Sequence, residues 1–194
     1  MIPFPEKKYN IIYADPAWEY EESGSKKNSR GLAKQHYSTM KTEDICRLDV
    51  QKISTDSTVL LMWVTFPRLE QGLQVISEWG FIYKTAAFVW VKKNKKAKST
   101  NFWGMGAYTR ANAEVCLLAI SKNTKAKQIV KSNAIHQIIE QPIERHSKKP
   151  EIVKEKIIEL FGDVPRIELF ARQKTPGWDV WGNEVEEVNT VYDI

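Results

Sequence analysis

The sequence is poor in the residues that build disulfide scaffolds and zinc sites. Of its 194 residues, two are cysteines and three are histidines. Cys46 and Cys116 do not form a Cys-x-x-Cys pair, and the histidines show no metal-ligand spacing beside them. We therefore expect no metal site and no disulfide framework, and we expect both cysteines to be small buried residues.

Long apolar runs are absent as well. No stretch reaches the roughly 20 consecutive apolar residues that a membrane-spanning helix needs. The first residues lack the basic and then apolar layout of a secretory signal. These absences predict a cytoplasmic protein without a membrane partner. The length fits one domain over residues 1–194, with a single sizeable core.

Positive charge exceeds negative charge in what remains. The chain has 29 Lys and Arg against 24 Asp and Glu, a formal net charge of +5. Such a balance suits a polyanionic partner such as nucleic acid. Three basic runs contribute, at residues 92–98, 122–131 and 145–149. They form either solvated faces or, if all three share one edge of the fold, a track for phosphates.

Short β-rich runs alternate with helical patterns along the chain. Apolar and β-branched runs predict strands at 9–14, 58–64, 81–91, 113–121 and 166–170. Helical spacing predicts helices at 42–50, with Thr42 as a cap, at 67–79 and at 150–161. This order is typical of an α/β fold with a mostly parallel sheet, which binds ligands beyond the carboxyl ends of its strands. Long polar stretches at 19–35 and 92–112 each follow a strand, so we expect them to overhang that edge.

One short motif comes directly after the first predicted strand: Asp15-Pro16-Ala17-Trp18. A carboxylate oxygen and the Pro16 carbonyl are acceptors for the two N–H bonds of an aromatic amine, and they stabilise the positive charge that builds during its methylation. An aromatic ring such as Trp18 holds a flat base by stacking. The alternative is a turn with a capping Asp and a core Trp. The tetrapeptide alone leaves both interpretations open.

Four further segments follow this motif in a recognisable order. With them, the chain resembles the N6-adenine methyltransferases named after the seventy-kilodalton subunit of the eukaryotic messenger-RNA adenosine methyltransferase. The resemblance runs from about residue 9 to residue 184. The matching segments are Ile12–Trp18, His36–Met40, Gly104–Ala119, His146–Glu151 and Arg166–Glu184.

This resemblance implies a Rossmann-like, three-layer fold in which the catalytic motif precedes the cofactor-binding segments. It implies S-adenosylmethionine as cofactor, and Asp15, Pro16, Ala17 and Trp18 as the catalytic residues. The family's second proline is Ala17 here, which removes neither acceptor nor ring. A dinucleotide-type Gly-x-Gly-x-x-Gly loop is missing, which agrees with a cofactor that carries no phosphate. The residues that the resemblance implies around the cofactor are Asp15, Lys149, Phe170, Arg172, Asn183 and Glu184.

Other residues are candidates for substrate contact or support. His36 and Tyr37 end the first polar stretch and are either base contacts or a surface His beside a packed Tyr. Tyr108 and Arg110 follow Gly104-Met105-Gly106 and are either substrate contacts or part of an ordinary turn. Glu114 either supports the pocket or ends a solvated strand. Four tryptophans are expected in the core or on strand faces: Trp63, Trp79, Trp90 and Trp103.

The sequence therefore predicts a methyltransferase that acts on the exocyclic amine of adenine in nucleic acid. The target base must be flipped out of a duplex or single-stranded. Similarity to bacterial and phage members favours DNA, and methylation of RNA adenosine is the alternative. A second alternative is a catalytically inactive nucleic-acid-binding subunit, against which the presence of Asp15 and Trp18 argues. A homodimer or a heterodimer is compatible with so small a domain.

Overall fold

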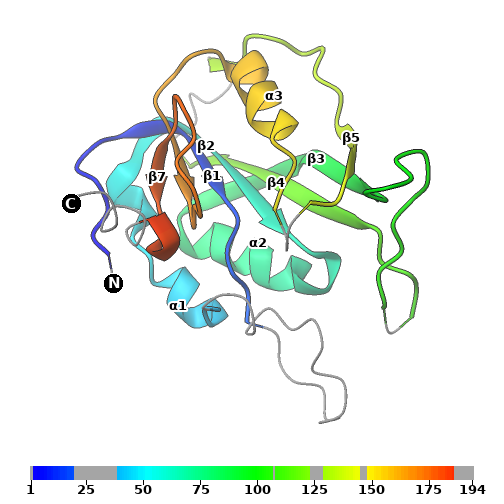
Figure 1. Ribbon diagram of the computed structural model, residues 1–194. Helices are drawn as coiled ribbons and strands as arrows, with labels where there is room; N and C mark the ends of the chain where they lie inside the picture. The colour runs from blue at the N-terminus through cyan, green and yellow to red at the C-terminus, as the bar shows by residue number, and fades with distance from the viewer. Residues whose placement is uncertain (1, 20–38, 107, 123–128, 145–147, 186–194) are drawn as a thin grey trace, which may run out of the picture.

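A seven-stranded sheet forms the centre of the molecule in the computed structural model (Figure 1). The structure describes residues 2–19, 39–106, 108–122, 129–144 and 148–185. Along the sheet the strand order is β5-β3-β4-β2-β1-β6-β7. The strands are β1 (Tyr9–Ala14), β2 (Ser54–Val64), β3 (Phe81–Lys93), β4 (Ala113–Ser121), β5 (Ile138–Pro142), β6 (Arg166–Leu169) and β7 (Asp179–Trp181).

Strand direction confirms the mostly parallel sheet. β1 pairs in parallel with β2 and β6, β6 with β7, and β3 with β5. β4 alone runs against its neighbours, β2 and β3. Its first residues therefore lie at the edge where the other strands end. In an open sheet of this kind ligands bind at that edge.

Helices cover both faces of the sheet and give the expected three layers. α1 (Thr42–Cys46) and α2 (Leu69–Glu78) lie on one face, and α3 (Ile152–Phe161) lies on the other (Figure 1). Alternate strand residues supply the two cores: Ile12 and Leu60 face α1 and α2, whereas Ile11 and Leu61 face α3. Because both faces are covered, the central strands are apolar throughout. Each fully buried side chain of this size contributes about 1.5–3 kcal/mol.

The helix ends follow the sequence in part. Gly80 and Gly162, with φ of 77° and 82°, terminate α2 and α3 as expected. α2 begins only at Leu69, because residues 66–68 form a 3₁₀ turn, η3 (Phe66–Arg68). Thr42 was expected to cap the first helix but is its first residue; Lys41 precedes it without a side-chain cap. That helix is short, and the rest of the predicted segment passes into a second 3₁₀ turn, η2 (Val50–Ile53).

Two short strands and the β3–β4 connection differ from expectation. β5 and β7 were not predicted, because β7 has only three residues and, in β5, two isoleucines are followed by a glutamate, a glutamine and a proline. Between β3 and β4, residues 94–112 form an arm that folds back on itself through the bridges Lys93↔Asn101 and Gly104↔Ala111. Trp103 lies on this arm and is 58% exposed, so the expectation that it is buried was wrong. Trp63, Trp79 and Trp90 are buried as expected.

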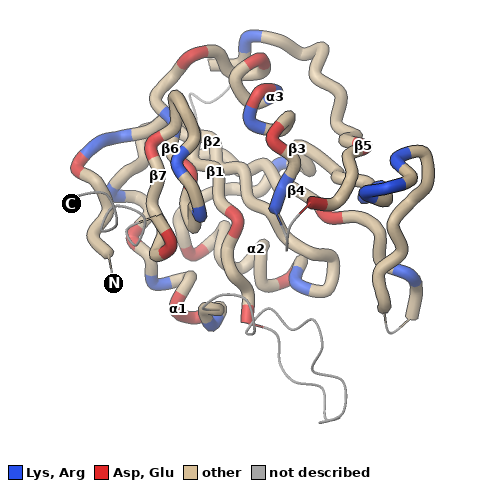
Figure 2. The backbone as a smooth tube through the Cα atoms, in the orientation of Figure 1, with Lys and Arg blue, Asp and Glu red and all other residues tan. Residues whose placement is uncertain are grey.

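Basic residues are spread over more than one edge of the fold. The arm carries Lys95, Lys96, Lys98 and Arg110 and no acidic residue (Figure 2). The second basic run starts at Lys122, just past the end of β4, and its far end bonds Leu160 in the last turn of α3. Both described ends of that run therefore lie at the opposite edge of the sheet from the arm. Lys122 and Lys131, the lysines of that run that the structure describes, therefore do not share a phosphate track with the arm.

Buried positions bear out one of the two cysteine expectations. Cys116 is fully buried in β4, and Cys46 is only half-buried at the end of α1. Within the described ranges, no helix is both long and apolar enough to cross a bilayer.

Candidate active site

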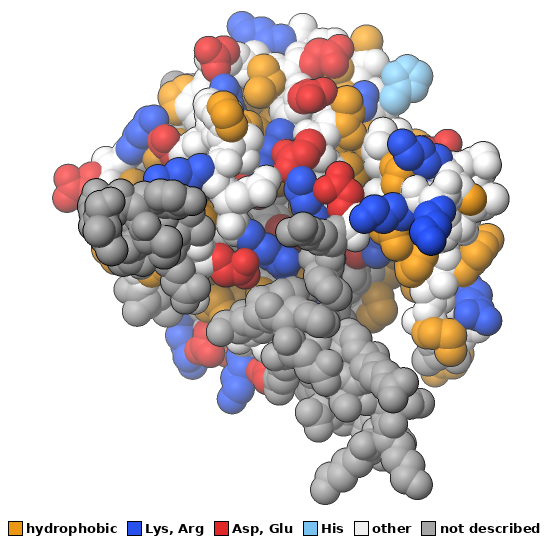
Figure 3. All heavy atoms as spheres, viewed as in Figure 1, with side chains coloured by type: hydrophobic (Ala, Val, Ile, Leu, Met, Phe, Trp, Pro, Cys, Tyr) orange, Lys and Arg blue, Asp and Glu red, His pale blue; other side chains and the backbone are white. Residues whose placement is uncertain are grey.

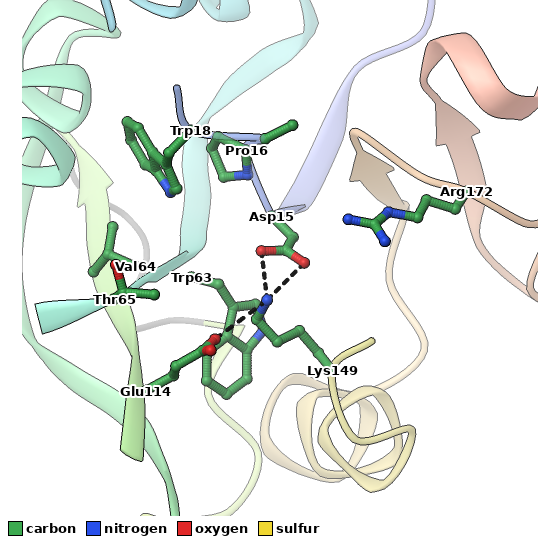
Figure 4. Close-up of a pocket in the computed structure, with 10 residues that line it drawn as sticks. Asp15, Pro16, Trp18, Trp63, Val64, Thr65, Glu114, Lys149 and Arg172 are labelled. Carbon is green, nitrogen blue, oxygen red and sulfur yellow. Dashed lines mark hydrogen bonds and ion pairs between the residues drawn. The ribbon is translucent and has the colours of Figure 1, made fainter. Parts of the chain in front are cut away.

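Side chains from several strands meet at the carboxyl edge of the sheet (Figure 4). Asp15 follows β1, Thr65 follows β2, and Phe170 follows β6. Glu114 reaches the same edge because β4 runs in the reverse direction. Lys149 joins them from the segment that leads into α3. The edge that the parallel sheet predicted is therefore where polar side chains converge.

Lys149 forms the centre of a charged cluster there. Its Nζ donates to both carboxylate oxygens of Asp15, each at 2.8 Å, and lies 3.3 Å from Glu114 Oε2. Lys92 Nζ binds the other oxygen of Glu114 at 2.5 Å. The Lys149 ammonium also lies over the Trp63 ring, 5.7 Å from its centroid. Two cations thus meet two carboxylates in a nearly closed space, where each charge depends on the others.

Burial and the uneven sharing of charge set the pKa values of this cluster. Burial raises the pKa of Asp15 above its ordinary value, because Lys149 offsets only part of the lost hydration. Burial acts on Glu114 in the same direction, but two ammonium groups outweigh it and lower the pKa of Glu114. Burial disfavours the charge of Lys149, yet the two carboxylates outweigh it and raise the pKa of Lys149. Of the two acids, Asp15 is the less compensated.

Backbone bonds fix the segment that carries Asp15. The Pro16 carbonyl accepts a bond from the Trp18 backbone N–H at 2.9 Å, and the Ala17 carbonyl accepts one from Met40 at 2.9 Å. Arg68 donates to the Glu19 carbonyl at 2.7 Å. A carbonyl oxygen has two lone pairs, so that of Pro16 keeps one acceptor site. The motif is thus held in place by hydrogen bonds from Met40 on one side and from Arg68 on the other.

Trp18 is more deeply placed than a stacking platform requires. It is 6% exposed and packs in the core on the α1 and α2 side of the sheet. Part of its ring lines a cavity together with Asp15, Pro16 and Thr65. This cavity has a volume of about 40 Å³, which admits water but not a purine. A group as large as a purine fits between Asp15 and Trp18 only when this cavity widens.

A second cavity, of about 300 Å³, adjoins the first. Asp15, Lys149 and Arg172 line both. The second cavity is lined by charges of both signs and by two aromatic residues. Its other lining residues are Tyr13, Lys148, Pro150, Glu151, Lys154, Glu168, Phe170, Gln173 and Glu184.

Glu168 is a residue of this cavity that the sequence interpretation did not single out. It pairs with Lys154 at 2.7 Å, and Lys154 donates to Thr175 Oγ1 at 2.7 Å. Burial raises the pKa of Glu168 despite that partner. The available signal was a carboxylate in the middle of an apolar strand, which is costly unless it is used or paired.

Phe170 has an unusual backbone. Its φ is 61°, and among the described residues no other residue apart from glycine has a positive φ. This conformation costs about 1–2 kcal/mol for a residue with a Cβ. The ring packs edge-on against Trp181 at 5.7 Å, and the next residue, Ala171, donates to the Trp181 carbonyl at 3.0 Å. Strain of this kind collects at functional sites, where the surroundings maintain it.

The other predicted site residues are dispersed. Glu184 lines the second cavity and lies 3.8 Å from Arg172, whereas Asn183 is exposed and lines neither of the two cavities described. Tyr108 is fully exposed on the arm, and Arg110 beside it donates to Met105 Sδ at 3.2 Å. His36 and Tyr37 lie outside the described residues. The structure thus brings together the tetrapeptide and most of the expected cofactor residues, but not the arm residues.

Lining residues that sequence reasoning missed come from the end of β2. Trp63 and Thr65 line the first cavity. No local signal in the sequence marks them. Their position follows from strand pairing, which places the end of β2 between β1 and β4.

Comparison with known proteins matches nearly the whole chain. A model of the MT-A70 family matches residues 9–184. The chain is 33% identical over 197 residues to the type II methyltransferase M.MunI of Mycoplasma sp, covering 94% of this chain and 80% of that protein. It is 26% identical to the human N(6)-adenine-specific methyltransferase METTL4, covering 92% of this chain and 38% of that protein. It is 23% identical to the Danio rerio N(6)-adenosine-methyltransferase subunit METTL3, covering 94% of this chain and 29% of that protein.

Proposed function

Because the chain belongs to the MT-A70 family, we propose that it transfers a methyl group from S-adenosylmethionine to the N6 amine of adenine in DNA. The observation that carries this proposal is the position of Asp15, which lines both a small cavity beside Trp18 and a larger charged cavity. An acid at this junction faces a base on one side and a methyl donor on the other. The chain spans less than two fifths of the vertebrate relatives, so the proposal rests mainly on M.MunI and on the geometry.

The second cavity fits the chemistry of S-adenosylmethionine. That cofactor carries a carboxylate, an ammonium group, two ribose hydroxyls and an adenine ring. Lys149 and Arg172 suit the carboxylate, and Glu168 and Glu184 suit the ammonium group or the hydroxyls. Phe170 offers an aromatic surface for the ring. When bound, the cofactor supplies an electrophilic methyl carbon.

Asp15 and the Pro16 carbonyl polarise the target amine. The amine nitrogen of adenine is a poor nucleophile because its lone pair is delocalised into the ring. Two acceptors aimed at its N–H bonds favour a tetrahedral nitrogen and stabilise the charge that builds on it. In this structure both oxygens of Asp15 accept from Lys149, and each oxygen keeps a second lone pair that can accept from the amine. Lys149 also lies 3.3 Å from Glu114, which holds the ammonium beside Asp15.

The arm supports nucleic acid as the substrate. Its tip exposes Trp103, Met105 and Tyr108, and its lysines lie close by in sequence. Figure 3 shows basic and hydrophobic side chains gathered on the side of the molecule that carries the arm. Aromatic rings that stack on bases, with cations for the backbone, are typical of nucleic-acid contact. On this proposal Tyr108 and Arg110 contact the strand beside the target base and not the base itself.

The test is a competition between DNA and RNA. The protein is incubated with isotopically labelled S-adenosylmethionine and equimolar DNA and RNA of the same sequence, and nucleosides from each are measured by mass spectrometry. The proposal predicts N6-methyldeoxyadenosine with little methylated adenosine. If only RNA is methylated, RNA and not DNA is the substrate. If neither nucleic acid carries labelled product although the protein binds the cofactor, the proposed activity is contradicted.

A further inference from the structure

The indole N–H of Trp18 has no acceptor among the described residues, although its nitrogen is shielded from solvent. Four other buried tryptophans donate their indole N–H to a hydroxyl or a carbonyl: Trp63 to Tyr13 Oη at 2.6 Å, Trp79 to Ile45 at 2.8 Å, Trp90 to Gln141 at 2.8 Å and Trp181 to Ile2 at 3.3 Å. Buried donors are nearly always paired, because an unmade bond costs the full desolvation of the group.

The unpaired donor lies where the proposed target base has to go. Trp18 lines the cavity formed with Asp15 and Pro16, and the nitrogen-bearing edge of its indole is turned toward the cavity (Figure 4). Trp18 is 6% exposed and belongs to the core on the α1 and α2 side of the sheet, so little of its ring is open for a base to stack on. The cavity therefore combines two acceptors, the Asp15 carboxylate and the Pro16 carbonyl, with one donor from the same short segment.

We propose that Trp18 Nε1–H donates a hydrogen bond to N1 of the target adenine, and so reads the base by its edge instead of stacking on it. The inference rests on the proposed function. Adenine presents an amine donor at N6 and, on the adjacent ring atom of its Watson–Crick edge, an acceptor at N1. The arrangement of Asp15, Pro16 and Trp18 is complementary to that pair. When the cavity widens to admit the base, N1 supplies the missing acceptor.

Selectivity favours N1 over N7, the other ring nitrogen next to the amine. N7 is an acceptor in both purines, so a donor to N7 does not separate adenine from guanine. N1 is an acceptor in adenine, but in guanine it carries a hydrogen and is a donor. In guanine the N1–H would therefore point at the Trp18 indole N–H, and no hydrogen bond can form between two donors. Enzymes that act on extruded bases commonly read the Watson–Crick edge, which extrusion exposes.

The experiment pairs two variants with two base analogues. Oligonucleotides carry adenine, 1-deazaadenine or 7-deazaadenine at the methylated position, and kcat/KM is measured for wild type, Trp18→Phe and Trp63→Phe. Trp63 lines the same cavity but already donates to Tyr13, which makes Trp63→Phe the matched control. The quantity compared is the ratio of kcat/KM on 7-deazaadenine to that on 1-deazaadenine, which cancels any general loss of packing.

The ratio is expected to fall about tenfold from wild type to Trp18→Phe, because the variant loses one hydrogen bond to the base. In Trp63→Phe the ratio is expected to stay within about twofold of wild type. An unchanged ratio in Trp18→Phe overturns the proposal, as does an effect confined to 7-deazaadenine. A stacking role predicts the unchanged ratio, because phenylalanine keeps an aromatic ring. If wild type does not methylate the adenine oligonucleotide, the proposed function itself has failed and this inference falls with it.

A second measurement covers the case in which Trp18→Phe does not fold. In wild-type protein labelled with ¹⁵N at tryptophan, the Trp18 indole N–H resonance is followed while S-adenosylhomocysteine and oligonucleotide are added. A hydrogen bond to N1 predicts a downfield proton shift with the adenine oligonucleotide that is absent with 1-deazaadenine. The same shift with both oligonucleotides contradicts the proposal.

Discussion

Removing the negative charge of Glu114 tests the charged cluster most sharply. Glu114 accepts from Lys92 at 2.5 Å and lies 3.3 Å from Lys149, and its side chain is only 9% exposed. Glu114→Gln leaves the Lys149 ammonium with Asp15 as its described carboxylate partner, and it removes the one carboxylate described beside Lys92, whose side chain is 20% exposed. Breaking a buried ion pair on one side costs about 3–5 kcal/mol, and partial exposure of Lys92 places the expected loss near the lower figure. A loss of about 3 kcal/mol lowers the melting temperature by roughly 6–12 °C in a chain of this size.

The same variant shifts the pH profile in a defined direction. On the proposed mechanism activity requires ionised Asp15, so the rate is expected to fall as the pH falls through the pKa of that residue. Glu114 is one of the charges that raise this pKa, after burial. Glu114→Gln therefore lowers the pKa of Asp15 and moves the acid limb of kcat/KM to lower pH. The sign is opposite to that of a general loss of structure, which narrows the profile from both sides.

Thermal unfolding and a pH–rate series on purified protein measure both effects. Glu140→Gln is the matched control, because Glu140 pairs with Lys93 at 2.9 Å but is 58% exposed. Exposed pairs of this kind contribute about 0–1 kcal/mol, so its melting temperature and acid limb are expected to stay near those of wild type. Equal melting temperatures for the two variants, or an acid limb that moves up in Glu114→Gln, refute the reasoning.

Three further predictions concern other parts of the molecule. The double variant Lys95→Glu, Lys96→Glu is expected to bind DNA more weakly, and the slope of log K against log salt is expected to fall by about 0.9 for each phosphate that it no longer neutralises. Fluorescence anisotropy at several salt concentrations measures this slope, and an unchanged slope would show that the arm does not contact DNA. Phe170→Ala raises the Kd for S-adenosylmethionine in calorimetry, and Phe170→Gly is more stable than Phe170→Ala by about 1 kcal/mol because glycine accepts the positive φ; equal stability argues against backbone strain. Gly72→Ala costs about 1–3 kcal/mol in denaturant unfolding, since the new Cβ would lie 2.4 Å from Val64 Cγ1; an undiminished midpoint shows that α2 is not packed that tightly.

The sequence was informative wherever a physical pattern is local. The apolar run of β1 and the acid that follows it are adjacent along the chain, so both the strand and the location of Asp15 at its end were predictable. Gly80 and Gly162 mark helix ends through a property of the single residue. The order of strands and helices was enough to predict an α/β fold with a mostly parallel sheet and a site at one edge of that sheet.

Strand direction and burial were not predictable in the same way. A strand pattern reads the same in both directions, so the reversal of β4, which places Glu114 beside Lys149, left no mark in the sequence. The bond between Lys149 and Asp15 joins residues 134 positions apart. From the sequence alone, Trp18 is equally well interpreted as a ring that stacks on a base or as a core residue. Only the packing shows that it is a core residue that also lines the cavity. For Trp103, an aromatic residue on an arm was mistaken for one in a strand.

The central claim is that Asp15 activates the amine of adenine for methylation, and one measurement tests it directly. Wild type and Asp15→Asn, matched for S-adenosylmethionine binding by calorimetry, are incubated with DNA and labelled cofactor, and the digested nucleosides are analysed by mass spectrometry. The account predicts N6-methyldeoxyadenosine from wild type and a rate at least about 10²-fold lower from Asp15→Asn, since the amide loses the charge and one acceptor oxygen. Methylation of another base by wild type, or undiminished turnover by Asp15→Asn, would contradict it.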